Sequence, residues 1–127
     1  GAKLKIKNPE LPMDDLINLP VLQDLADIYF EANGVKPTVT PEMAAQAAGS
    51  TDVGNVSHVC PTAYVEVGLD GPDVFYAHEE SALKLVDGPE ARKKMHQTIC
   101  AMTGIALDLA IRTEQIETAK KQLQDRK

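Results

Sequence analysis

The sequence predicts an α/β fold with few strands and long flanking helices, and two patterns carry this prediction. Short segments at 2–7 and 62–69 have the alternating or β-branched composition of strands. Amphipathic helical patterns cover 20–32 and the region from 89 onward. Strands that alternate with helices are typical of an α/β layer. Because only two or three strands are visible, the helices lack a sheet to cover, and we expect the chain to be part of a larger unit.

The bulk composition is that of one soluble globular domain. The chain has 127 residues, of which 43% are hydrophobic and 25% are charged. Its net charge of −6 disfavours nucleic acid as a partner. No apolar run approaches the ~20 residues of a membrane span. Because the sequence also opens without an apolar signal-peptide stretch, we expect a cytoplasmic protein with no membrane partner.

The N-terminal part is expected to form a strand and then a helix. Residues 2–7, Ala-Lys-Leu-Lys-Ile-Lys, alternate as a half-buried strand does, and Pro9 ends it. A helix over 20–32 follows, with Asn18 as its N-cap and Gly34 as its left-handed stop. Its apolar stripe consists of Leu22, Leu25, Ala26, Ile28, Tyr29 and Ala32.

The C-terminal part is expected to contain short strands and a long helix. Residues 35–39 form a possible short strand, and residues 62–69 read as a buried strand. The run Asp87-Gly88-Pro89-Glu90 opens a helix, with proline in its first turn. One uninterrupted helix to the end of the chain would be unusually long, so we expect a break near Arg112-Thr113. The helical stripe consists of Met95, Ile99, Met102, Ala106 and Leu109.

The two cysteines, Cys60 and Cys100, lie far apart in the sequence. Neither belongs to a CxxC motif or to a Cys/His cluster with metal spacing. The simplest interpretation is a pair of buried thiols. A disulfide is the alternative that the sequence leaves open.

The run from Gly49 to Pro61 is the most distinctive in the sequence. A Gly-Ser-Thr turn followed by Asp52 can present backbone N–H groups and two hydroxyls to an anion, such as a substrate carboxylate. The alternative is an N-capping turn, in which Ser50, Thr51 or Asp52 satisfies the first N–H groups of a short helix. The residues alone leave both interpretations open.

His78 is the candidate metal ligand. It follows a loop and is followed by Glu79 and Glu80, and its other interpretation is a polar surface residue. A zinc ligand needs further ligands within about 2.0–2.2 Å of the ion. No H-x-x-x-H spacing joins His78, His58 and His96. The sequence therefore does not encode a complete metal site by itself.

The segment GSTDVGNVSHVCPT at 49–62 resembles a block found in the amidohydrolases related to aminoacylase and aminobenzoyl-glutamate hydrolase. The match is closest to the aminobenzoyl-glutamate hydrolase and dipeptidase branch of this carboxypeptidase-like family. The resemblance implies that 1–7 are the last strand of an inserted lid domain. It also implies that 8–127 are the C-terminal part of a split catalytic α/β domain.

Family members hydrolyse an N-acyl or peptide amide next to a free carboxylate, using two divalent ions of zinc, manganese or cobalt and a glutamate base. The resemblance implies that Gly49, Ser50 and Thr51 contact the carboxylate side of the substrate, and that His78 is a metal ligand. His78 is followed by Glu79, where relatives often have Ser or Thr. No catalytic residue is assigned, because the base and the other ligands would lie upstream.

Several partners follow from this resemblance. They are the missing N-terminal half of the same polypeptide, a small amide or peptide substrate, and a second copy in a homodimeric parent. We expect the chain alone to be inactive and to hold no metal tightly. The apolar faces of the helices at 20–32 and 89–112 are expected to lie against one of these chains. The alternative is a non-catalytic binding or regulatory module of the same fold.

Overall fold

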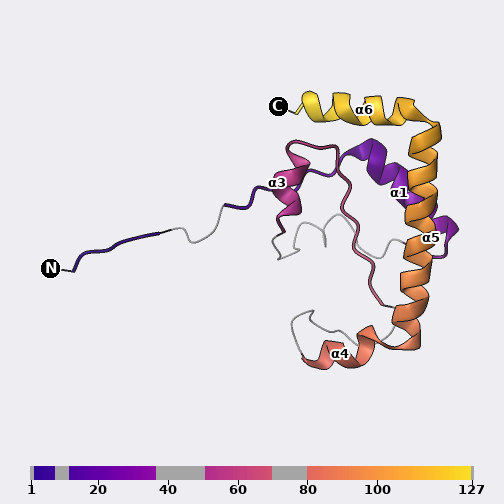
Figure 1. Cartoon of the computed structure of the whole chain (residues 1–127), viewed down its shortest axis with the longest axis horizontal. Coiled ribbons are helices and arrows are strands. Elements are labelled where there is room, and N and C mark those ends of the chain that lie inside the picture. Colours follow the sequence, from indigo (N-terminus) through magenta and orange to yellow (C-terminus); the bar gives the residue numbers. More distant parts are fainter. Residues whose placement is uncertain (1, 8–11, 37–50, 70–79, 127) are drawn as a thin grey trace.

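The computed structural model describes residues 2–7, 12–36, 51–69 and 80–126, and their regular secondary structure is helical. Figure 1 shows a long helix, α5, with α1 beside it, α4 at its N-terminal end and α6 turning away from its C-terminal end. None of the described helices combines the length and the apolar content needed to cross a bilayer. The helices are α1 (Pro20–Ala32), α3 (Val53–Ser57), α4 (Glu80–Val86), α5 (Pro89–Ile111) and α6 (Thr113–Gln124).

The main core lies where α1 crosses α5. Ala26, Phe30 and Ala101 are buried there. Gly104 on α5 allows the close approach, because a Cβ at this position would lie 2.4 Å from Cδ1 of Tyr29. A second cluster joins the start of α1 to α6 through Leu19, Ala119 and Leu123. The helices therefore pack against one another, with α1 in contact with both α5 and α6.

The predicted α/β fold is wrong, because the described residues contain helices and no strand. The segment 62–69 keeps the alternation of a strand: Val65 and Val67 pack against the core, whereas Tyr64 and Glu66 are exposed. However, this segment packs on α1 and α5, and one backbone hydrogen bond, from the Leu19 N–H to the Thr62 carbonyl, joins it to another described extended segment (Figure 1). A single backbone hydrogen bond is not a ladder, so no sheet forms.

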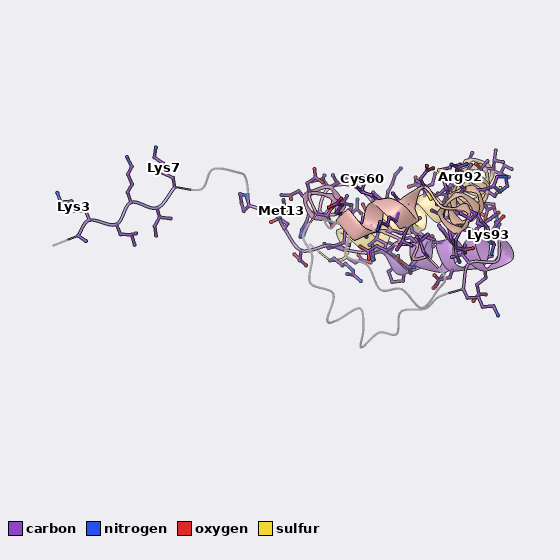
Figure 2. The ribbon with its side chains drawn as sticks, turned by 90° about the horizontal axis from the view of Figure 1, so that it is seen from below. Lys3, Lys7, Met13, Cys60, Arg92 and Lys93 are labelled. Atoms are coloured by element: carbon purple, nitrogen blue, oxygen red, sulfur yellow. The ribbon has the colours of Figure 1, made fainter. Side chains whose placement is uncertain are left out.

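The other two predicted strands are also absent from the described residues. Residues 2–7 are exposed along their whole length, and Figure 2 shows them projecting from the helical body. Leu4 and Ile6, expected on a buried face, are 86% and 79% exposed. Of the predicted strand at 35–39, only the first two residues lie within the described part, and they are not in a strand. The domain division after residue 7 stays a prediction.

The bounds of α1 are confirmed, but its cap is not. The helix spans Pro20–Ala32, and Gly34 follows it with a φ of +78°, as the left-handed stop requires. Leu19, rather than Asn18, occupies the N-cap and makes no side-chain hydrogen bond. The Asn18 side chain instead accepts a hydrogen bond from the Tyr64 N–H at 2.7 Å. The residue that looked like a local cap therefore joins two distant segments.

The break between α5 and α6 is confirmed, and it falls at Arg112. The guanidinium of Arg112 reaches back one turn and pairs with both carboxylate oxygens of Asp108, which is buried. The hydrogen bond with Asp108 is the main cause that raises the pKa of Arg112. The pair therefore closes the last turn of α5 where the chain changes direction. The short helix α4 was not anticipated from the sequence.

The predicted apolar stripe of α5 forms a helix face, but much of that face is exposed. Met95, Ile99 and Met102 are 60%, 55% and 55% exposed. The face that packs against α1 is a neighbouring one, marked by Ala101, Gly104 and Ile105. Because α5 is apolar on more than one face, spacing alone could not identify the face that is covered.

We predict that the α1–α5 contact dominates the stability of the helical body. Replacing Phe30, which is 6% exposed, with alanine should lower the free energy of unfolding by about 3–5 kcal/mol, because it leaves a cavity. Ile28 on the same helix is 63% exposed, so Ile28→Ala should cost less than about 1 kcal/mol. Urea unfolding followed by circular dichroism measures both. Equal losses in the two variants would contradict this packing.

Candidate functional site

The described part of the 49–62 block forms α3, and its side chains bind residues 12–17. Asn55 is the first of these contacts. Its Nδ2 donates to the carbonyl of Pro12 at 3.1 Å and to the carboxylate of Asp14 at 3.2 Å. Its Oδ1 accepts the N–H of Asp14 at 3.4 Å. One amide side chain therefore satisfies both donors and acceptors of a segment more than forty residues away.

Ser57 forms the buried centre of this contact. Its side chain is fully buried, and its hydroxyl accepts the N–H of Ile17 at 2.9 Å and donates to the carbonyl of Gly54 at 2.6 Å. Gly54 allows the two segments to meet, since a Cβ there would lie 2.1 Å from the carbonyl oxygen of Asp14. Any larger residue at position 54 would push the two backbones apart.

His58 completes the contact at the end of α3. Its Nε2 lies 3.0 Å from the carbonyl oxygen and 3.2 Å from the carboxylate of Asp15. Because both partners are acceptors, this nitrogen carries a proton and donates. The ring thus has a structural partner in the segment that α3 holds, which the sequence did not reveal.

Thr51 is the one predicted substrate-binding residue within the described part of the chain. It is half-buried, and its hydroxyl accepts the N–H of Val53, the first residue of α3, at 3.3 Å. The capping interpretation is therefore confirmed for Thr51, whereas Asp52 makes no cap hydrogen bond. Contact with a substrate carboxylate stays a prediction for this residue.

The remaining predicted site residues, Gly49, Ser50 and His78, lie outside the described residues. The convergence of His78 with the turn at 49–51 on one cleft therefore stays a prediction. Within the part of the chain that the structure describes, no three His, Cys, Asp or Glu side chains are grouped so as to hold a metal ion.

Both cysteines are free and exposed, so the prediction of buried thiols is wrong. Cys60 follows α3, and Cys100 lies on α5, where its side chain is exposed. The Sγ of Cys100 lies 3.8 Å from Nδ1 of His96. The sequence carries a signal for this pair, because residues four apart on a helix are neighbours. The prediction that neither cysteine has a histidine at metal spacing is therefore wrong for Cys100.

No protein-family model, curated protein or solved structure matches the chain. The resemblance of residues 49–62 to the amidohydrolase block therefore rests on the residues of that block. The structure adds a role for four of them: Gly54, Asn55, Ser57 and His58 hold residues 12–17 against α3.

We predict that Ser57→Ala weakens this contact. The change removes the acceptor of a backbone N–H in a buried setting, so the free energy of unfolding should fall by about 1–3 kcal/mol. The amide of Ile17 should also lose its protection from hydrogen exchange. Thr103→Ala is the matched control, because its exposed hydroxyl only bonds the carbonyl of Ile99 within α5. A Ser57 variant as stable as this control, with Ile17 still protected, would contradict the contact.

Proposed function

We propose that this chain is the C-terminal part of the catalytic domain of a metal-dependent amidohydrolase or peptidase. The parent enzyme would hydrolyse an N-acyl or peptide amide next to a free carboxylate. The observation that carries the proposal is the block at 49–62, whose described residues form one unit with residues 12–17. A turn that contacts substrate must be held by a rigid support, and α3 supplies such a support directly after Thr51.

Exposed apolar side chains around α3 support the proposal that another polypeptide covers this surface. Val56 and Val59 are 50% and 75% exposed, and Met13, in the segment that α3 binds, is 49% exposed. Apolar side chains that remain exposed together beside a candidate site are typical of a surface that another polypeptide covers. We propose that the N-terminal half of the parent protein covers this surface and supplies the other wall of the cleft.

The donor set of this chain does not complete the proposed metal centre. His78 is the single ligand that the resemblance assigns here, and one imidazole cannot replace the hydration of a zinc, manganese or cobalt ion. The other ligands and the general base would come from the missing half. We therefore expect the isolated chain to be inactive, and the parent to act as a homodimer on a small amide or peptide.

The proposal predicts a specific loss in the protein encoded by the complete reading frame. His78→Ala in that protein should lower kcat/KM for N-acyl amino acids and dipeptides by at least about 100-fold, because a metal ligand is lost. Metal analysis should show less bound ion than in the unchanged protein. His58→Gln is the matched control, because glutamine retains a donor for Asp15 and leaves the candidate centre untouched.

Two results would overturn the proposal. One is a reading frame that encodes no further His, Asp and Glu ligands. The other is a longer protein that hydrolyses none of these substrates with zinc, manganese or cobalt. Either result would favour a non-catalytic binding or regulatory module.

A further inference from the structure

One exposed face of α5 carries two metal-binding side chains in adjacent turns. His96 and Cys100 are both exposed, and Cys100 is a free thiol. Their nearest ligand atoms, Nδ1 and Sγ, are 3.8 Å apart. The helix backbone fixes this pair, since side chains four residues apart lie one above the other. Neither residue takes part in the contact between α3 and residues 12–17.

The separation of these two atoms matches the geometry of a tetrahedral zinc ion. With Zn–S near 2.3 Å, Zn–N near 2.1 Å and a tetrahedral angle at the metal, the two ligand atoms lie about 3.6 Å apart. The observed distance between Nδ1 and Sγ is 3.8 Å. A small rotation of either side chain would remove the difference. A thiolate and an imidazole are also ligands that zinc prefers. The pair can therefore supply two of the four ligands of such an ion.

The surface of α5 is uncharged from Met95 to Leu107, and the exposed Arg92 and Lys93 lie one turn before His96. Residues 95–107 include no Asp, Glu, Lys or Arg. Met95, Ile99 and Met102 are all more than half exposed, and their spacing of four and then three residues is the spacing of a helix–helix seam. In the sequence, Met95 directly precedes His96, Ile99 directly precedes Cys100, and Met102 follows Cys100 by two residues. An exposed uncharged helix face of this length is typical of an interaction surface.

We infer that His96 and Cys100 are half of a zinc site that two copies of this chain share across their α5 helices. A structural zinc site takes four protein ligands, and one copy supplies two. A two-fold axis through the ion adds the same pair from the second copy, which gives two sulfur and two nitrogen ligands. The two thiolates neutralise the charge of the ion, and the apolar faces around it cover each other. One chain supplies only two of the four ligands, so the site is incomplete without a second copy. We therefore assign this surface of α5 to a second copy of the chain.

The test is zinc-dependent association of the whole chain under reducing conditions. Sedimentation equilibrium with zinc chloride should show a dimer that holds one ion per two chains, and EDTA should return it to monomer. His96→Ala and Cys100→Ser should each weaken zinc-dependent dimerisation by at least about tenfold. His58→Gln and Cys60→Ser are matched controls with an exposed thiol or imidazole elsewhere, and both should dimerise as the unchanged chain does.

Two measurements on the unchanged chain avoid any effect of substitution on folding. Cobalt(II) should give the absorption of a tetrahedral thiolate complex, and zinc should protect Cys100, but not Cys60, from alkylation. No zinc binding, one ion per monomer without association, or equal loss in the Cys60 and Cys100 variants would each overturn the inference. A zinc site that depended on His78 alone would also overturn it. The activity of the parent protein does not bear on these readouts, so the inference fails or stands independently of the proposed function.

Discussion

The fold depends on the hydrogen bonds by which α3 holds residues 12–17. The Ser57 hydroxyl is fully buried between the N–H of Ile17 and the carbonyl of Gly54. Directly after this contact the Leu19 N–H donates to the Thr62 carbonyl at 2.9 Å, so the two segments stay side by side. A buried hydroxyl without hydrogen-bond partners destabilises the fold by more than one hydrogen bond stabilises it. Other alignments of the two segments are therefore disfavoured. The register of the two segments is set here.

That register places the start of α1, and α1 in turn positions the other long helices. Leu19 has no exposed surface, and it packs against Ala119 and Leu123 of α6. About two and three turns further along α1, Ala26 and Phe30 pack against Ala101 of α5. The pairing at α3 thus orients α1. Burial of apolar side chains along α1 then packs α5 and α6 against it. Polar contacts supply the specificity, and apolar contacts supply most of the stability.

Features determined by neighbouring residues could be predicted from the sequence. The bounds of α1, the opening of α5 at Pro89 and the break at Arg112 follow from proline, glycine and helical spacing. The predicted strand at 62–69 has the correct alternation of side chains. It is not a strand because a single backbone hydrogen bond, at Thr62, joins it to another described segment, and single-sequence periodicity carries no information about pairing.

The candidate site was less predictable, because its partners are distant in the sequence. Local chemistry suggested that the block at 49–62 caps a helix or binds an anion, and it left three residues, Ser50, Thr51 and Asp52, open as the cap; the structure shows the bond from Thr51. It could not show that Asn55 and Ser57 bind a segment forty residues upstream. Similarly, helical spacing on α5 showed an apolar stripe but not which of its faces α1 covers. A face that stays exposed is where a further partner of this chain can bind.

Nuclear Overhauser contacts test the pairing of α3 with residues 12–17 most directly. The α-carbon of Gly54 faces the carbonyl of Asp14 so closely that no side chain fits between them. If α3 and residues 12–17 pair in this way, the folded chain gives cross-peaks between the α-protons of Gly54 and backbone protons of Asp15. Their absence from an otherwise well-dispersed spectrum would show that the two segments do not meet, and that α3 does not hold residues 12–17.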